Sequence, residues 1–359
     1  MTRPVRAAID LKALRVNLQR VRTAAPLARV LAVIKANGYG HGLTRVAEAL
    51  HDADAFGVAS VEEALVLREA GIAHPIVMLE GFFEAGELAE ISRHRLSVVI
   101  HHEQQLQILE KTDIARHISV WIKIDTGMHR IGFPPGQAAA IYQRLRDSNK
   151  IAARIRLMTH LANADDRNDE YTARQLTEFL GAIDGLDGER SVANSAGVLA
   201  WPQTHMEWVR PGIMLFGVSP FLDGVAQQEG LSPVMTLSSR LIAINRFRRG
   251  DAIGYGGSWI CPEDMPIGVV AIGYGDGYPR SMPAGAPVLV RGQRAAVVGR
   301  VSMDMLCIDL RDLPQAQIGD EVELWGRNLP IEEIARLAGT IPYELLCGIT
   351  QRVPIVEQG

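Results

Sequence analysis

The feature that most constrains this chain is a regular alternation of apolar and helix-like segments over residues 11–230. Segments with helical periodicity, such as 61–71 and 169–183, separate apolar runs that are mostly continuous blocks of β-branched and aliphatic residues. Continuous apolar runs are typical of strands covered on both faces. Strand and helix repeating eight times predicts an α/β fold, a (β/α)8 barrel of the TIM type. The eight runs are 29–37, 55–60, 75–81, 96–101, 120–127, 154–162, 191–197 and 210–217.

The sequence changes character after residue 230. Residues 231–359 contain short strand-like runs separated by turns rich in glycine, proline and aspartate, which predicts a β-rich C-terminal domain. One helix is expected near residues 331–339. We expect residues 1–10 to form an N-terminal strand that packs with this C-terminal domain.

Composition excludes several classes of protein. A net charge of -4 gives no reason to expect a general affinity for nucleic acid or anionic membranes. The three cysteines are scattered, so they predict neither a metal site nor a disulfide framework and suit a reducing compartment. The first thirty residues lack an apolar stretch of signal-peptide length, and no run of about 18 apolar residues occurs. A cytoplasmic protein is therefore expected.

Each predicted barrel strand ends in a polar or conformationally permissive residue. In such barrels the C-terminal strand ends face one common mouth, where functional groups gather. Lys35 in "VIKANGYGHG" could therefore be functional, although lysines also end strands simply to reach water. The residues at the eight ends are Lys35, Ser60, Glu80, His101, Lys123, His160, Asn194 and Gly212.

A lysine amine at a barrel mouth can form an imine with an aldehyde when burial or a nearby cation depresses its pKa. Pyridoxal phosphate is the commonest such aldehyde, and its phosphate needs an anion site. Two segments offer one: "NSAG" supplies the Ser195 hydroxyl, and "RPGIM" supplies backbone N–H groups around Gly212 and Ile213. Each signal is weak alone, since a serine before a helix is often an N-cap and Pro-Gly is often a turn.

A set of motifs, taken together, resembles the alanine racemase family of fold-type III pyridoxal-phosphate enzymes. The resemblance runs in unbroken order over most of the chain and includes both the lysine motif and the tyrosine motifs of the β-rich region. The motifs are "VIKANGYGHG", "KIDTGMHRIGF", "MTHLANAD", "NSAG", "VRPGIMLFG", "GYGG", "GYGDGYPR", "GRVSMDM" and "IPYELLC".

The resemblance implies a role for each matching residue at the cofactor. Lys35 would hold pyridoxal phosphate as an imine and act as one catalytic base, and Arg210 would face the pyridine nitrogen without protonating it. The remaining cofactor-binding residues it implies are Tyr39, His160, Asn194, Ser195, Gly212, Ile213 and Tyr343.

Racemisation removes a proton from one face of Cα and delivers one to the other, which two fixed bases can do without moving the substrate. The family's second base matches Tyr255. An isolated phenol has a pKa near ~10, so it needs a neighbour that favours its ionised form. His160, linked onward to Arg210, matches that neighbour.

The resemblance also implies substrate-binding residues and a homodimer with shared active sites. Arg130 and the Met303 N–H would bind the substrate carboxylate, and Tyr274 would line the substrate corridor. Tyr255, Tyr274 and Met303 would act on the partner's site. Lys123 matches a lysine that is often carbamylated, and the carbamate would hold Arg130 by charge-assisted hydrogen bonds.

The activity implied is interconversion of L- and D-alanine, supplying D-alanine for bacterial peptidoglycan or breaking D-alanine down. A broader racemase acting on serine, a non-catalytic pyridoxal-phosphate homeostasis protein and a fold-type III decarboxylase are alternatives. The predicted β-rich domain argues against the homeostasis protein, which lacks it. The cysteine-bearing motif expected of the decarboxylases is not found in the sequence.

Overall fold

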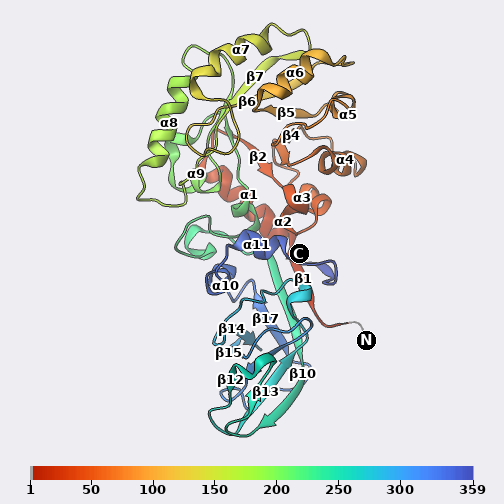
Figure 1. Ribbon diagram of the computed structural model, residues 1–359, viewed down its shortest axis with the longest axis vertical. Helices are drawn as coiled ribbons and strands as arrows, with labels where there is room; N and C mark the ends of the chain where they lie inside the picture. Colours follow the sequence, from red (N-terminus) through yellow and green to blue (C-terminus); the bar gives the residue numbers. More distant parts are fainter. Residues whose placement is uncertain (1–2, 359) are drawn as a thin grey trace. The chain divides into compact units, whose positions relative to one another are not determined.

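The computed structural model describes residues 3–358, which form two compact units (Figure 1). The barrel unit contains residues 15–215 and 220–223. The β-rich unit contains the chain up to residue 14, residues 216–219 and the chain from residue 224 onward. The domain boundaries expected from sequence, at residues 10 and 230, stay predictions.

Eight parallel strands close the barrel, and the last strand pairs with the first. The interior is filled by one apolar residue from each of seven strands, including Leu31, Trp121 and Trp208. A filled interior leaves functional groups to the barrel ends. The predicted (β/α)8 fold is confirmed. The strands are β2 (Arg29–Val33), β3 (Ala55–Val58), β4 (Ile76–Met78), β5 (Ser97–Ile100), β6 (Ile118–Lys123), β7 (Ile151–Met158), β8 (Arg190–Ser191) and β9 (Trp208–Val209).

Helices follow the strands and cover the outside of the barrel (Figure 1). Their sequences place apolar residues on the covered face: in α8, Leu176 and Phe179 are buried while Arg174 and Glu178 are exposed. The helices of this unit are α2 (Lys35–Tyr39, a turn that contains left-handed residues), α3 (Leu43–Ala49), α4 (Val61–Glu69), α5 (Glu87–Arg93), α6 (Glu103–Lys111), α7 (Ala138–Arg146), α8 (Tyr171–Ala182) and α9 (Ser195–Ala200), and α1 (Leu11–Ala24) precedes β2.

The eighth predicted strand was placed wrongly, at 210–217. The strand β9 is Trp208–Val209, and Ile213–Phe216 forms a 3-10 helix, η3. Pro211 has no N–H to donate to a strand ladder, so pairing stops before it. The run is apolar because η3 is buried, a case in which an apolar run does not distinguish a strand from a buried helix.

The β-rich unit is built on the long strand β10 (Met235–Phe247), which pairs with β1 (Arg6–Asp10), β13 (Met265–Val270) and β17 (Glu321–Trp325). β1 lies between β10 and β18 (Ile355–Gln358), so both ends of the chain enter one sheet. The other strands of this sheet are β14 (Pro287–Val290), β15 (Gln293–Val298) and β16 (Leu306–Asp309).

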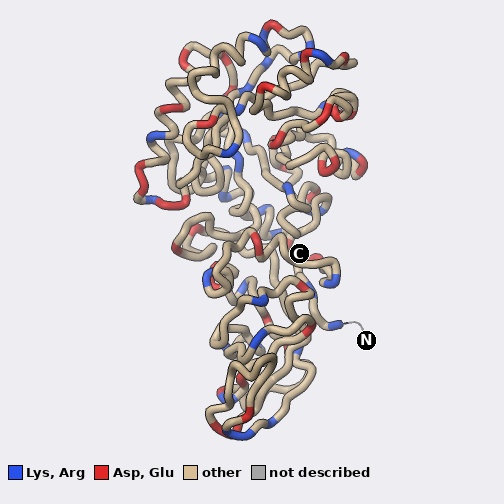
Figure 2. Tube along the Cα trace, viewed as in Figure 1, with Lys and Arg blue, Asp and Glu red and all other residues tan. Residues whose placement is uncertain are grey.

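Residues 331–347 form two α-helices, where the sequence suggested one: α10 (Ile331–Ala338) and α11 (Pro342–Cys347). Pro342 begins α11, the position where proline is tolerated in a helix. Figure 2 shows Lys and Arg interspersed with Asp and Glu along the chain, in keeping with 37 basic and 41 acidic residues. Among residues 3–358, no helix has the length and apolarity needed to span a membrane.

Candidate active site

Lys35 lies two residues beyond β2, at the C-terminal mouth of the barrel. The residues before it are still bonded to the neighbouring strands, since the Val33 N–H donates to the Pro211 carbonyl and the Ile34 N–H to the Gly57 carbonyl, both at 2.9 Å. The Lys35 amine is half-exposed, and its Nζ is 3.9 Å from Glu80 Oε1, two residues after the end of β4. The amine is therefore held at the mouth and remains reachable.

The backbone after Lys35 is left-handed for five consecutive residues. The φ angles of Ala36, Asn37, Gly38, Tyr39 and Gly40 are 54°, 54°, 62°, 51° and 79°. Left-handed backbone costs a residue with a Cβ roughly 1–2 kcal/mol. Such conformations persist only where the surroundings impose them, and they cluster at functional sites.

Three side chains impose this turn. Asn37 Oδ1 accepts the Leu43 N–H at 2.9 Å, and Glu63 Oε1 accepts the Asn37 N–H at 3.3 Å. His41 Nδ1 donates to the carbonyl oxygens of Gly38 and Tyr39 at 3.1 and 2.8 Å. His41 is fully buried, and burial lowers its pKa to about 4, so the ring is neutral near pH 7.

The turn brings the Tyr39 hydroxyl to the backbone of Gly212. A Cβ at position 212 would lie 2.4 Å from Tyr39 Oη, so only glycine permits this approach. Ser195 Oγ accepts the N–H groups of Gly212 and Met214 at 2.9 and 3.4 Å. The hydroxyls of Tyr39 and Ser195 therefore lie beside the backbone of residues 212–214, the segment that contains Ile213.

The N-cap interpretation of Ser195 is wrong. Asn194 caps α9 instead, because its Oδ1 accepts the Gly197 N–H at 2.9 Å. Ser195 is the first residue of that helix, and its hydroxyl points to the 212–214 backbone.

Arg210 follows β9 and is buried, with 4% of its surface exposed. Its Nη1 donates to Ser191 Oγ at 2.6 Å, and its Nη2 contacts the Val192 carbonyl and His160 Nδ1, both at 3.3 Å. Its Nε donates to none of residues 3–358. Burial lowers the Arg210 pKa to about 10, which still leaves the guanidinium charged at neutral pH.

His160 lies beside this guanidinium, two residues after β7. Its pKa lies well below its usual range, first because of burial and then because of the positive charges of Arg210 and Lys123. The ring is therefore neutral. Since Nδ1 faces an arginine donor, the proton belongs on Nε2.

Lys123, the last residue of β6, is 8% exposed. Burial, together with the positive charges of Arg210 and Arg130, lowers its pKa to about 7. Arg130 itself is exposed, on a loop that Asp125 shapes: the Asp125 carboxylate accepts the N–H groups of Gly127, His129 and Arg130 at 3.0–3.1 Å. The sequence analysis did not single out Asp125, although it lies inside the "KIDTG" motif.

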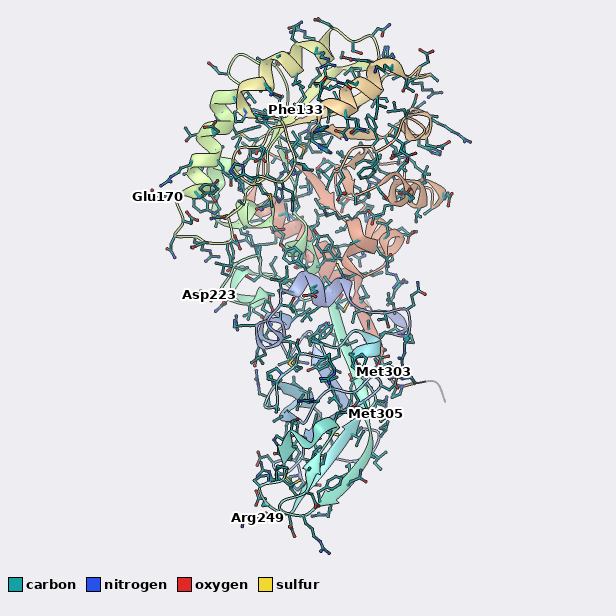
Figure 3. The ribbon with its side chains drawn as sticks, in the orientation of Figure 1. Phe133, Glu170, Asp223, Arg249, Met303 and Met305 are labelled. Carbon is teal, nitrogen blue, oxygen red and sulfur yellow. The ribbon has the colours of Figure 1, made fainter. Side chains whose placement is uncertain are left out.

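The other candidate residues lie in the β-rich unit. Tyr255 follows β11 (Ala252–Ile253) and is 65% exposed, while Tyr274 and Met303 are 40% and 51% exposed (Figure 3 labels Met303). The segments that carry Tyr274 and Met303 are held together, since the Tyr274 N–H donates to the Ser302 carbonyl at 3.0 Å. Tyr343 lies on α11.

A buried carboxylate that the sequence analysis did not single out anchors those segments. Asp276 Oδ2 accepts the Gly273 N–H at 3.0 Å and Arg3 Nη2 at 2.8 Å. Arg3 Nη2 also donates to the Asp304 carbonyl at 3.1 Å, next to Met303, and Arg352 Nε lies 3.4 Å from Asp276 Oδ1. No sequence signal marks Arg3, because its partners lie about 270 to 300 positions away.

The barrel unit thus combines a lysine amine, two hydroxyls beside the 212–214 backbone and a buried arginine at one mouth. This arrangement defines a (β/α)8-barrel protein with a reachable amine at its C-terminal mouth. Among residues 3–358, no group of three or more His, Cys, Asp or Glu side chains is placed to hold a metal ion.

Comparison with known proteins identifies the family. The family model "Alanine racemase, N-terminal domain" matches residues 9–220, and "Alanine racemase, C-terminal domain" matches residues 234–357. An alanine racemase of Coxiella burnetii is 51% identical over 358 residues, covering 98% of each chain, and one of Nitrosococcus oceani is 54% identical over 349 residues, covering 97% of this chain and 98% of that one. The chain belongs to the alanine racemase family.

Comparison with solved structures supports the same family assignment. A biosynthetic alanine racemase from Pseudomonas aeruginosa matches with a TM-score of 0.97 at 46% identity, covering 100% of both chains. An alanine racemase from Acinetobacter baumannii matches with a TM-score of 0.94 at 37% identity, covering 99% of this chain and 100% of that one. The barrel and the β-rich unit both have counterparts in the family.

Proposed function

We propose that this chain is a pyridoxal-phosphate-dependent alanine racemase that interconverts L- and D-alanine. The observation that carries the proposal is the grouping of Lys35, the Ser195–Gly212 anion site and the buried Arg210 at one barrel mouth. We further propose that it works in the bacterial cytoplasm, supplying D-alanine for peptidoglycan or breaking it down.

The residues present fit pyridoxal phosphate. Gly212 leaves room that a Cβ would fill beside the Tyr39 hydroxyl, which suits a phosphate drawn close to backbone N–H groups. Ser195, Asn194, Ile213 and Tyr343 complete the proposed set around the phosphate, and Arg210 Nε supplies a donor for the ring nitrogen. The bound cofactor would supply an aldehyde for the Lys35 amine and a ring that stabilises negative charge at the substrate Cα.

Two bases would act on opposite faces of Cα. The Lys35 amine exchanges a proton with Cα on one face, and the Tyr255 phenol oxygen does so on the other. Neutral His160, with its proton on Nε2, can hydrogen-bond the phenolate oxygen. Because Arg210 binds His160 Nδ1 at 3.3 Å, the positive charge beside the ring favours the ionised phenol.

Substrate binding would draw on both units. Arg130 supplies a cation and the Met303 N–H a donor for the alanine carboxylate. Tyr274 narrows the approach, which favours a side chain as small as methyl. We propose that Tyr255, Tyr274 and Met303 serve the site of the partner in a homodimer, as their high exposure in the isolated chain suits residues that another copy covers.

Lys123 is proposed to be carbamylated. A pKa of about 7 leaves a substantial share of its amine neutral at physiological pH, and only the neutral amine attacks carbon dioxide. The ammonium first loses one proton, and the neutral amine then forms an N–C bond with carbon dioxide and releases a second proton. The two steps together replace a buried cation by an anion beside Arg130 and Arg210. Intact-mass analysis after incubation with bicarbonate should find the mass of one carbon dioxide added at pH 8 and less at pH 6. A bare amine at both pH values would exclude the modification.

Incubation with L-alanine in deuterated water tests the proposed activity. A racemase produces D-alanine and α-deuterated alanine of both configurations, whereas a decarboxylase releases carbon dioxide and an amine. L-serine in a parallel reaction measures the breadth of specificity. Failure to incorporate deuterium at Cα would refute the proposed function.

A further inference from the structure

The barrel has a cavity at the end opposite Lys35. Its volume is about 550 Å3, and its walls include residues at the N-terminal ends of the strands, among them Arg29, Ala55 and Ser97. Arg29 begins β2, whereas Lys35 follows the end of that strand, so the two sites are separated by the filled barrel interior. None of the residues proposed for racemisation lines this cavity.

Four arginines line the cavity: Arg29, Arg68, Arg95 and Arg156. Arg29 and Arg156 share a single carboxylate, Glu189, which also accepts the Trp208 indole N–H at 3.0 Å. One carboxylate between two guanidinium groups leaves a positive charge uncompensated on this side of the cavity.

The other two arginines of the lining have no carboxylate partner among residues 3–358. Neither Arg68 nor Arg95 forms an ion pair with any of residues 3–358. Arg68 is held by backbone carbonyls instead, with Nε donating to the His94 oxygen at 3.1 Å and Nη1 to the His74 oxygen at 2.9 Å. Burial lowers the Arg68 pKa, which reflects a desolvated cation with no counter-charge.

The one carboxylate in the lining does not correct this imbalance. Asp54 Oδ2 is 3.3 Å from Arg22, a cation outside the lining, and accepts the Val30 N–H at 2.8 Å. The charge of Asp54 is therefore already matched. The cavity retains an excess of positive charge, which favours an anion with more than one negative charge.

The floor of the cavity is aromatic. The Trp121 and Trp208 rings meet edge to face, with centroids 5.7 Å apart. The guanidinium of Arg29 lies 4.2 Å from the Trp208 ring centroid, and that of Arg156 lies 5.3 Å from the Trp121 centroid. These stacking contacts hold two cationic groups beside an apolar surface.

We propose that this cavity binds a small organic phosphate monoester, with the phosphate among the arginines and the apolar body against the tryptophan floor. A phosphate monoester carries close to two negative charges at neutral pH and matches the guanidinium fork. The volume is sufficient for a ligand of that size. The site is separate from the proposed cofactor phosphate site at Ser195.

Calorimetric titration of the cofactor-loaded enzyme with phenyl phosphate, at fixed low ionic strength, tests the proposal. We expect binding at or below about 1 mM, weaker binding of inorganic phosphate, and no comparable binding of phenol. The absence of phenyl phosphate binding in the millimolar range would overturn the proposal. Equal binding of phenol would overturn the phosphate contact, and equal binding of inorganic phosphate would overturn the role of the tryptophan floor.

Matched variants locate the site. Arg95→Asn removes an exposed cation from the lining at a left-handed position (φ 53°) that asparagine accepts, so the fold should be retained. It should weaken phenyl phosphate binding about 3- to 10-fold, and Arg29→Gln should weaken it independently. Arg93→Asn removes a nearby exposed arginine outside the lining and should change nothing. Equal affinity in all variants, or loss of binding on Tyr39→Phe instead, would contradict the proposed location.

Discussion

The two units of this chain hold their candidate site residues in opposite ways. In the barrel, Arg210 and Lys123 are 4% and 8% exposed, and Arg210 is fixed by hydrogen bonds within its own unit. In the β-rich unit, Tyr255 and Met303 are 65% and 51% exposed. The barrel half of the site is therefore built by the fold itself, whereas the other half is a set of exposed groups on a fixed backbone. The contrast shows that exposure alone separates the candidate residues fixed inside one unit from those that remain open to another molecule.

The largest effect on the racemisation rate is expected from replacing Lys35 in the barrel unit. Lys35→Ala should abolish covalent cofactor attachment and lower the racemisation rate by on the order of 1000-fold or more, because it removes both the linkage and a base. Borohydride reduction followed by peptide mapping should label Lys35 in the unchanged protein only. Lys111→Ala, an exposed lysine on α6, is the matched control. A label on another lysine, or equal rates in the two variants, would contradict the assignment.

Replacing Tyr255, the proposed second base, should lower the racemisation rate without lowering the cofactor content. Tyr255→Phe removes only the phenol oxygen and should lower the rate by about 100- to 10,000-fold, the usual range for a general acid or base. Cofactor content and the label on Lys35 should stay unchanged, because Tyr255 is not among the residues proposed to hold the cofactor. Loss of cofactor in this variant would contradict the assignment of Tyr255 as a base that does not hold the cofactor.

The turn that carries Tyr39 should make stability depend on pH. The His41 pKa is about 4 in the folded chain and about 6.5 when unfolded, so the unfolded state binds more protons between these values. The contribution of neutral His41 to the free energy of unfolding is fully present above pH 6.5, and about 3 kcal/mol of it is lost as the pH drops to 4. In His41→Asn, this pH-dependent change in the free energy of unfolding should disappear from denaturation curves measured across that range. It should persist in His51→Asn, which alters an exposed histidine. If the free energy of unfolding depends on pH in the same way in the His41 variant and the unchanged chain, this prediction is wrong.

The smallest effect is expected where Arg3 supports the Met303 segment. Arg3→Gln should raise KM for alanine about 3- to 10-fold while leaving kcat and cofactor content close to unchanged, since it removes hydrogen bonds to Asp276 and Asp304 worth about 1 kcal/mol. Arg6→Gln is the control, since it breaks an ion pair between Arg6 on β1 and Glu321 on β17. A fall in cofactor content instead of a change in KM would argue against a positioning role.

The barrel was predictable from sequence because its strands are short, apolar and regularly spaced, and the lysine motif lies at a strand end. The left-handed turn after Lys35 was missed, although Asn37-Gly38 and the glycines at 40 and 42 carry its signal, since these residues accept positive φ. The role of Asn194 as helix cap was hidden because Ser195 can cap equally well. The Arg3–Asp276 contact could not be found from sequence, because no local pattern relates residues so far apart.

Mixing two inactive variants tests most directly whether two copies complete each site. Lys35→Ala and Tyr255→Phe dimers would be dissociated together, reassociated and assayed. If each site takes Lys35 from one copy and Tyr255 from the other, half of the randomly formed dimers are mixed and each mixed dimer regains one intact site. Activity should then return to about one quarter of that of the unchanged protein. If the mixture stays as inactive as its components although mixed dimers are present, each site is confined to one chain and the proposed sharing is wrong.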